Sequence, residues 1–373
     1  MSISQTIKEL SENASKATSK FALLGFDGFV DRIIKVVDQR SGPGEHYTAM
    51  TMIDQLGFRI SAAAGESANI ELYAQYEKLG GNGPIMANAI LAAGLDVQYI
   101  GTLGNPIHPV FKEFAAQTKA ISSIEPGITH ALEFDDGKIM LGEMAHFAKF
   151  DYKSILEAMG EGAFKDALAR ADLFALVNWT MIPAMTAIFE DLLTKALPSL
   201  PPKDGGRTFF FDLADPAKRS KADLRGALFA IKRFQAHGRV VLGLNLAEAR
   251  QVLSVLELSD PGNTPEDLKS IATILRNQLE IACVIVHPRE GAACATREES
   301  QYVAGPFCKD PKISTGAGDH FNAGFSMAWT LGLSPVACLT VAVATSGQYV
   351  RTAQSPSIGD TLDFLLEWDA GEV

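Results

Sequence analysis

The segment 312–325 combines a glycine-rich turn with a single carboxylate, Asp319. Phe321 and Phe325 follow at helical spacing, so the turn is predicted to open a helix. The N–H groups at a helix start bind anions and stabilise a carboxylate. Asp319 could therefore be a base held beside a phosphoryl group. The alternative is a turn that leads into a helix, with an acidic residue in the favourable first helical turn and no chemical role. The three turn residues are Gly316, Ala317 and Gly318.

A second polar pair, Asn245 and Glu248, has the spacing of one helical face. It follows an apolar strand expected at 240–244. An amide and a carboxylate at such a junction could hold hydrated Mg²⁺ near nucleotide phosphates, because Mg²⁺ keeps several of its waters. The same spacing is that of an N-cap Asn with a capping-box Glu. The two residues alone leave both interpretations open.

Strands and helices alternate regularly from residue 171 onward, and this pattern must position both motifs. Short apolar strands alternate with amphipathic helices, and the helix after Thr264 has an N-cap followed by proline. The alternation predicts an α/β fold with a doubly wound, mainly parallel sheet flanked by helices. The expected strands are 173–177, 208–211, 240–244 and 281–286, and the expected helices lie near 182–197, 224–236 and 264–279.

Polar residues follow the strand expected at 21–26, which is the first of the chain, and the strands expected from residue 173 onward. In open α/β sheets, ligands bind beyond the carboxyl ends of the strands. Each of these residues alone fits a cap or a turn. Their repetition beside the glycine-rich turn predicts a site. They are Asp27, Asp31, Asn178, Asp212, Asn245 and His287.

The N-terminal half contains two β-rich excursions from the main domain. Residues 33–79 show a turn at 41–44 and no long amphipathic helix, whereas the segment 129–141 has a hairpin signal at Asp135-Asp136-Gly137-Lys138. Between them, the run that starts at Gly80 opens a helix closed by Gly94. The expected division is a main domain of 1–32, 80–127 and 147–373 and a small unit of 33–79 and 128–146.

Composition excludes several classes of protein. The 373 residues carry a formal charge of -11, with a pI near 5.2, which argues against nucleic-acid binding. The four cysteines form no C-x-x-C pair, residues 2–20 lack the apolar stretch of a signal peptide, and no apolar run approaches bilayer length. We therefore expect a cytoplasmic protein without membrane partners. P-loop, dinucleotide, zincin and hydrolase motifs are absent from the sequence.

Taken together, the motifs resemble those of the ribokinase-like, or PfkB, carbohydrate kinase family. They occur in the family's order and span residues 31–357, nearly the whole chain. The matching motifs are Gly80-Gly81 with a helix ending at Ala93-Gly94, Asn245-x-x-Glu248, and Ser314-Thr315-Gly316-Ala317-Gly318-Asp319-x-Phe321-x-x-Gly324.

The resemblance implies Mg-ATP-dependent transfer of the γ-phosphoryl group to a hydroxyl of a sugar or sugar-like alcohol. Asp319 would be the general base, with an anion hole formed by Gly316, Ala317 and Gly318. The segments 33–79 and 128–146 would form a β-lid over the sugar, which in relatives often makes a homodimer. The substrate residues implied are Asp31, Asp27, Gly81, Asn82 and Asn178. The ATP residues implied are Asn245, Glu248, His287 and Gly291, of which Asn245 and Glu248 would also hold Mg²⁺ through water.

Three positions depart from the family pattern. Ile85 stands where an Asn is usual, and Asn82 or Asn88 would have to compensate for it. Ile313 replaces an Asp that helps to bind a monovalent cation, so dependence on such a cation stays open. His287 stands where Thr is common. The alternatives are a nucleoside kinase of the same fold, a catalytically silent sugar-binding protein and, more remotely, an oxidoreductase.

Overall fold

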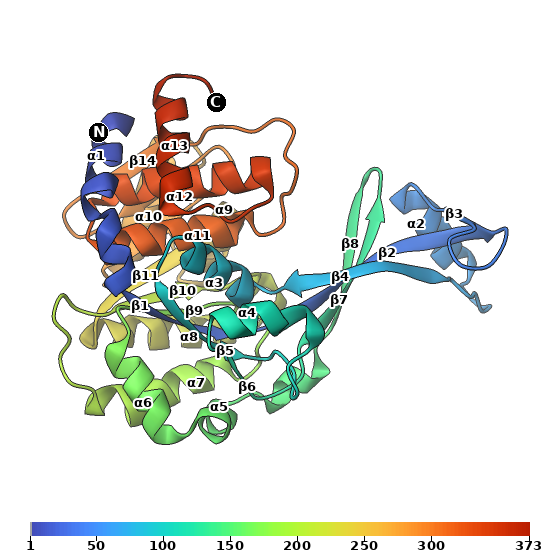
Figure 1. Cartoon of the computed structure of the whole chain (residues 1–373), viewed down its shortest axis with the longest axis horizontal. Helices are drawn as coiled ribbons and strands as arrows, with labels where there is room; N and C mark the ends of the chain where they lie inside the picture. The colour runs from blue at the N-terminus through green and yellow to red at the C-terminus, as the bar shows by residue number, and fades with distance from the viewer. Residues whose placement is uncertain (1) are drawn as a thin grey trace.

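The computed structural model describes residues 2–373, which form an α/β body and a smaller sheet that projects from it (Figure 1). The body contains a nine-stranded sheet in the order β14-β13-β12-β11-β10-β9-β1-β5-β6. Its pairs are parallel from β6 to β12, and β12, β13 and β14 pair antiparallel. The strands are β1 (Phe21–Phe26), β5 (Asp96–Gly101), β6 (Ile121–Ser122), β9 (Leu173–Leu176), β10 (Thr208–Asp212), β11 (Arg239–Leu244), β12 (Cys283–Val286), β13 (Gly291–Ala295) and β14 (Ser300–Ala304).

Helices cover both faces of this sheet, which confirms the predicted fold class. All residues of β1, β9 and β10 are buried, as expected for strands between two helical layers. One layer consists of α1 (Ile3–Asn13), α3 (Asn82–Ala92), α4 (Lys112–Gln117), α11 (Ala317–Leu331), α12 (Pro335–Thr352) and α13 (Ile358–Asp369). The other consists of α5 (Tyr152–Met159), α6 (Glu161–Arg170), α7 (Met185–Asp191), α8 (Lys221–Arg233), α9 (Leu246–Val255) and α10 (Pro265–Leu279).

The projecting sheet has five strands. Its order is β3-β2-β7-β8, and β4 also pairs with β2. The strand β2 begins at Phe29, before the expected start of this unit at residue 33. The strands are β2 (Phe29–Arg40), β3 (Tyr47–Ala49), β4 (Leu72–Gly80), β7 (Gly127–Phe134) and β8 (Gly137–Glu143). Asp31 therefore lies within a strand of the projecting sheet and not in a loop after β1.

Two helix predictions were wrong in detail. The segment 33–79 contains a helix, α2 (Ile53–Ala62), which packs Leu56 against β2 and β7 at the far end of the sheet (Figure 1). Its pattern is obscured because Phe58 is 78% exposed and Ile60 is 57% exposed. The helix expected at 182–197 is α-helical only in α7, and the chain continues as a π-turn from Leu192 to Ala196.

Other local predictions are confirmed. The strand β1 has the expected bounds, α3 starts after Gly81 and is followed by Gly94 in a left-handed conformation, and Thr264 caps α10. The turn after Phe134 joins β7 and β8 as an antiparallel hairpin. Within residues 2–373, no helix is both long enough and apolar enough to cross a membrane.

Candidate active site

Asp319 lies in the first turn of α11, at the carboxyl edge of the main sheet. Gly316 is the N-cap of this helix and has φ 88°, a conformation that favours glycine. A Cβ atom at Gly316 would lie 3.1 Å from Ile85 Cγ2 and 3.1 Å from the Tyr349 hydroxyl oxygen. The turn therefore needs glycine for two reasons, its dihedral angle and its close neighbours. First-turn N–H groups have no intrahelical acceptor, so those of Gly318 and Asp319 are available at this end of the helix.

The turn is held by contacts with its own helix and with α12. His320 Nδ1 lies 2.8 Å from the Gly316 carbonyl oxygen, and its Nε2 lies 2.9 Å from Ser355 Oγ. The Tyr349 hydroxyl donates to the Thr315 carbonyl oxygen at 3.0 Å, and its ring stacks on His320 with centroids 3.5 Å apart. Burial lowers the pKa of His320 to about 4. The imidazole is therefore neutral at pH 7, with Nδ1–H donating and Nε2 accepting.

The Asp319 carboxylate is buried and receives one hydrogen bond from α3. Asn82 Nδ2 donates to Asp319 Oδ1 at 2.9 Å. Burial raises the pKa of Asp319 well above its ordinary value, and the negative charge of Asp212 raises it further. The hydrogen bond from Asn82 lowers the pKa, while the charge of Asp27 opposes that effect. A carboxylate with a raised pKa is a stronger proton acceptor than an exposed one, as long as the pH keeps it ionised.

Asp27 is fully buried beneath the start of α3, on the side of Asn82 away from the pocket. Its Oδ2 accepts from the Asn82 backbone N–H at 2.9 Å and from Asn178 Nδ2 at 2.7 Å, and its Oδ1 accepts from the Gly83 N–H at 2.8 Å. Burial raises the pKa of Asp27 to about 6, although these three donors lower it. Asp27 is not one of the residues that line the pocket above Asp319, so its expected direct contact with the substrate stays a prediction.

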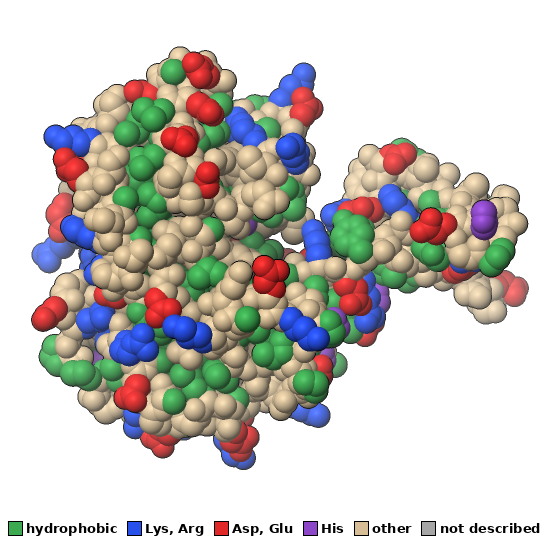
Figure 2. All heavy atoms as spheres, viewed as in Figure 1, with side chains coloured by type: hydrophobic (Ala, Val, Ile, Leu, Met, Phe, Trp, Pro, Cys, Tyr) green, Lys and Arg blue, Asp and Glu red, His purple; other side chains and the backbone are tan. Residues whose placement is uncertain are grey.

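The pocket beside Asp319 has a volume of about 320 Å³ and lies between the body and the projecting sheet. Figure 2 shows the hollow where the projecting sheet leaves the body. Asp31 and Thr129, which are ladder partners on β2 and β7, line it from the sheet. Burial raises the pKa of Asp31, while Thr129, Lys78 and Lys138 lower it. The structure thus brings together six of the predicted residues, which are Asp31, Gly81, Asn82, Asn178, Gly316 and Asp319.

Two residues near Asp319, Lys218 and Asn322, were not among the predicted ones, and the predicted Asp212 also lies there. Lys218, at the end of a short 3₁₀ turn, lines the same pocket and has no motif to mark it. Asp212 stands out only as a polar residue after a strand. Its Oδ2 accepts from Asn322 Nδ2 at 3.0 Å, and burial raises its pKa to about 6. Asn322 could have been found, because it lies three residues after Asp319 and so on the same face of α11.

Asn245 and Glu248 form a complete capping box at the start of α9. The Glu248 N–H donates to Asn245 Oδ1 at 2.9 Å, and Glu248 Oε2 accepts from the Asn245 N–H at 3.0 Å. Burial raises the pKa of Glu248 well above its ordinary value, and the charges of Asp212, Asp215 and Asp319 contribute. The box explains the spacing without a metal. The electrostatic coupling nevertheless places Glu248 among the acidic groups of the site, and its expected contact with Mg²⁺ stays a prediction.

The other residues expected near the nucleotide lie at the same edge of the sheet. The His287 ring stacks on Phe321 with centroids 4.5 Å apart, and burial lowers its pKa to about 4. Gly291 starts β13, where a Cβ atom would overlap the Val303 carbonyl oxygen. Close strand packing thus accounts for this glycine, and its role toward ATP stays a prediction. The backbone N–H groups of Lys312 and Ile313 donate to the Val350 carbonyl oxygen, at 2.8 and 3.4 Å.

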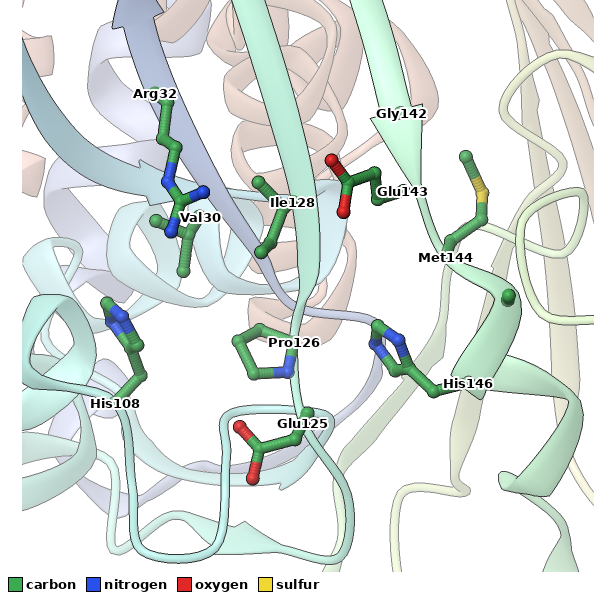
Figure 3. A pocket seen from close by; sticks show the side chains of 11 residues that line it. Val30, Arg32, His108, Glu125, Pro126, Ile128, Gly142, Glu143, Met144 and His146 are labelled. Carbon is green, nitrogen blue, oxygen red and sulfur yellow. The ribbon is translucent and has the colours of Figure 1, made fainter. Parts of the chain in front are cut away.

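A larger cavity of about 670 Å³ lies on the opposite face of the projecting sheet. Its lining includes Val30 and Ile128, which alternate along their strands with Asp31 and Thr129. In Figure 3 the side chains of Arg32, Glu143 and His146 lie around this cavity. It contains none of the predicted site residues. Size alone therefore does not identify the site, and the carboxylates and the helix N-terminus favour the smaller pocket.

Comparisons with known proteins agree with this geometry. A family model described as prokaryotic ketohexokinase matches residues 3–368. A ketohexokinase of Haloferax volcanii is 26% identical over 344 residues, which cover 92% of this chain and 90% of that protein.

Solved structures share the fold. The ribokinase of Arabidopsis thaliana, determined with ribose and ATP, superposes with a TM-score of 0.63 at 16% identity, covering 93% of this chain and 98% of that one. A carbohydrate kinase from Agrobacterium tumefaciens gives a TM-score of 0.62 at 19% identity, covering 93% and 97%. A putative ribokinase II from E. coli in complex with ATP and Mg²⁺ gives 0.61 at 14% identity, covering 93% and 99%. The chain shares the fold of the ribokinases, belongs to the prokaryotic ketohexokinase family and is a carbohydrate kinase.

Proposed function

We propose that this protein transfers the γ-phosphoryl group of ATP to a hydroxyl of a ketohexose, with Asp319 as the general base. The observation that carries the proposal is the buried Asp319 carboxylate at the start of α11, in a pocket lined by both the body and the projecting sheet. The ketohexose is suggested by the name of the Haloferax volcanii relative, which aligns over most of both chains. Fructose is the simplest substrate of this class to test.

The chemistry requires one proton acceptor and stabilisation of the transferred group. Asp319 takes the proton of the sugar hydroxyl, whose oxygen then attacks the γ-phosphorus while ADP leaves. The available N–H groups of Gly318 and Asp319, at the turn formed by Gly316, Ala317 and Gly318, stabilise the negative charge of the phosphoryl oxygens together with the positive end of α11. Lys218, which lines the pocket, adds a positive charge there.

Within residues 2–373, no group of three or more His, Cys, Asp or Glu side chains is arranged to hold a metal ion directly, so Mg²⁺ near Asp212 would be held through water. Burial raises the pKa values of Asp212, Glu248 and Asp319, and the charge of Asp212 also raises those of Glu248 and Asp319. A cation would relieve that repulsion. Asn322 Oδ1 is also a buried acceptor without a hydrogen-bond partner within residues 2–373. When bound, Mg²⁺ would neutralise the phosphate charges of ATP. Glu248 and Asn245 would hold it through water, and His287 and Gly291 would contact the nucleotide. We make no proposal about a monovalent cation.

The sugar would lie between the projecting sheet and the body. Asp31, Asn82 and Asn178 offer carboxylate and amide groups to its hydroxyls, and the backbone at Gly81 borders the same pocket. The projecting sheet would act as a lid, because closure of Asp31 and Thr129 over the sugar would exclude water that competes as phosphoryl acceptor.

The lid would also form a homodimer. Tyr76 is 57% exposed and Met140 is 48% exposed, and both lie on the lid face that carries Asp31. This assignment of faces follows from the ladder partners, since residues two apart in a strand share a face. A second copy of the chain that covers these side chains would remove apolar surface from water.

A phosphoryl-acceptor panel tests the proposed function. The purified protein would be incubated with Mg-ATP and, separately, with fructose, other ketohexoses, glucose, ribose and adenosine, and ADP release would be measured. We expect the highest kcat/KM with a ketohexose, and NMR of the product would identify the phosphorylated hydroxyl. Preference for adenosine would favour the nucleoside kinase alternative. Sugar binding by calorimetry without any phosphorylated product would favour a catalytically silent protein.

A further inference from the structure

We propose that Asp27 and Asn82 are positioning residues that orient the Asp319 carboxylate, with Asp27 fixing the start of α3 and Asn82 connecting that start to the base. The catalytic part of this inference rests on the proposed function, in which Asp319 is the base. It assigns Asp27 a role below the pocket and not in direct contact with the sugar.

The Asp27 carboxylate caps the start of α3. Gly81 is the N-cap residue of this helix and has no side chain to accept the first N–H groups. Asp27 accepts them instead, from Asn82 at 2.9 Å and from Gly83 at 2.8 Å. Asn178 Nδ2 holds the same carboxylate at 2.7 Å from the other side. A side chain from the loop between β1 and β2 thus replaces an N-cap residue of the helix itself.

These hydrogen bonds require the backbone at the start of α3 to approach the Asp27 carboxylate closely. Gly81 has φ 97°, and a Cβ atom there would lie 2.8 Å from Asp27 Oδ2. A Cβ atom at Gly83 would lie 2.7 Å from Asp27 Oδ1 and would overlap the Tyr99 hydroxyl, which itself donates to the Asp27 carbonyl oxygen. The glycines on both sides of Asn82 therefore let the backbone settle onto the buried carboxylate. Asn82 between them keeps its side chain.

A hydrogen bond from the Asn82 side chain connects the start of α3 to Asp319, the proposed base. Asn82 Nδ2 donates to Asp319 Oδ1 at 2.9 Å, although 237 positions separate the two residues. Because Oδ1 is engaged, Oδ2 remains for the proton of the substrate. The bond also favours the ionised form of Asp319, which burial and the neighbouring acids oppose.

Other charged and titratable groups surround the base and bear on its titration. Asp27, Asp212 and Glu248 interact electrostatically with Asp319, as do the hydroxyl groups of Tyr99 and Tyr349. Asp31 and Lys218 line the same pocket. Within this set, Asn82 is the residue whose side chain donates a hydrogen bond to the Asp319 carboxylate. Its removal should therefore change the base without changing the charge of the site.

Replacement of Asn82 by Ala tests the connection from Asp27 through Asn82 to Asp319. The backbone N–H at position 82 can still donate to Asp27 in this variant, so the start of α3 is retained. We expect the acidic limb of the kcat/KM profile to move to higher pH by about one unit, because loss of a donor to the charged form makes the carboxylate harder to ionise. At pH 7, kcat should fall by about tenfold while KM for ATP stays within about twofold. The matched control is Asn277→Ala on α10, an exposed amide that does not line the pocket, which should leave the profile unchanged.

The variant Asp27→Asn tests the attachment of the helix. An amide of the same size keeps the packing but presents its NH₂ group to one of the backbone donors. It should lower kcat more than it raises KM for ATP, as Asn82→Ala does. If Asn82→Ala leaves both the acidic limb and kcat unchanged, the positioning role of Asn82 is refuted, whatever the result for Asp27→Asn.

A readout without turnover separates this inference from the proposed function. In protein labelled with ¹³C at the aspartate carboxyl groups, the Asp319 resonance is the one that Asp319→Asn removes. Its titration midpoint should rise in Asn82→Ala and stay unchanged in Asn277→Ala. If no sugar is phosphorylated but this midpoint rises, the proposed function fails and the positioning role of Asn82 stands. If a sugar is phosphorylated and the midpoint does not move, the positioning role of Asn82 is refuted and the proposed function stands.

Discussion

At the scale of single residues, the site is a set of carboxylates held where the fold disfavours their charge. Asp27, Asp212, Glu248 and Asp319 all have raised pKa values, and burial is the first cause for each. Such groups cost folding free energy at neutral pH, because the unfolded chain ionises them more easily. The protein therefore gives up stability to keep these carboxylates buried, as expected for the phosphate, metal and proton-transfer site that we propose.

Replacement of Asp319 by Asn should separate stability from activity. The proposed general base is lost, so kcat should fall by roughly 10²–10⁴. The folded-state pKa of Asp319 lies above its unfolded value, so the carboxylate destabilises the wild type progressively as the pH rises above about 4. The variant should then be more stable than the wild type at pH 7, and this difference should shrink toward pH 4. Urea midpoints across this range and turnover with the best sugar measure both effects. Near-wild-type turnover would exclude Asp319 as the base.

At the scale of elements, the start of α11 depends on a glycine that no other residue can replace without cost. Gly316 combines a left-handed N-cap with Ile85 and Tyr349 directly above it. The Ile85 side chain packs over the turn. The neutral His320 ties the same turn to α12.

Replacement of Gly316 by Ala should lower both stability and kcat. The left-handed conformation costs about 1 kcal/mol for Ala, and the contacts with Ile85 and Tyr349 add about 1–3 kcal/mol. Displacement of the turn N–H groups should reduce kcat by about tenfold or more, because small shifts in a phosphate site are costly. The measurements are urea unfolding and steady-state kinetics.

The matched control lies at the other end of the same helix. Gly332 has φ 87°, and among the described residues a Cβ atom there would have no neighbour within 4 Å. Gly332→Ala should therefore show the cost of the conformation alone, about 1 kcal/mol, with unchanged kcat. Equal losses of stability in the two variants would show that the neighbours of Gly316 do not matter.

At the scale of the whole molecule, the two faces of the projecting sheet have different surroundings. One face covers the pocket with Asp31 and Thr129 and continues into exposed apolar side chains. The other face is covered at its far end by α2. An exposed, partly apolar sheet face on a projecting element favours association, and a second copy of the chain is the simplest occupant.

Replacement of Tyr76 by Glu should weaken the proposed homodimer. A charge at this lid position would be desolvated in the interface, so the dimer dissociation constant should rise by about tenfold or more. Light scattering coupled to size-exclusion chromatography over a range of protein concentrations measures it. Phe58→Glu, on the outer side of α2, is the control and should leave the association unchanged. A wild-type protein that is monomeric at all concentrations tested would refute the dimer.

The sequence by itself determined the fold class and the turn at Asp319. Apolar strands alternate with amphipathic helices, and glycines mark the turns that need left-handed residues, so short-range patterns carry this information. The bounds of β1, the start of α3 and the β7–β8 hairpin were predicted for the same reason. The helix α2 was missed because its large apolar side chains Phe58 and Ile60 point to solvent.

Only the tertiary structure decided how the polar residues are arranged. Asn82 reaches Asp319 across 237 positions, Asp27 caps a helix to which it does not belong, and Asp31 belongs to the projecting sheet. Such contacts depend on how distant elements pack, and a local pattern contains no record of that packing. The sequence therefore indicated which residues could do the chemistry, and the packing of α3 against α11 decided which of them contact Asp319.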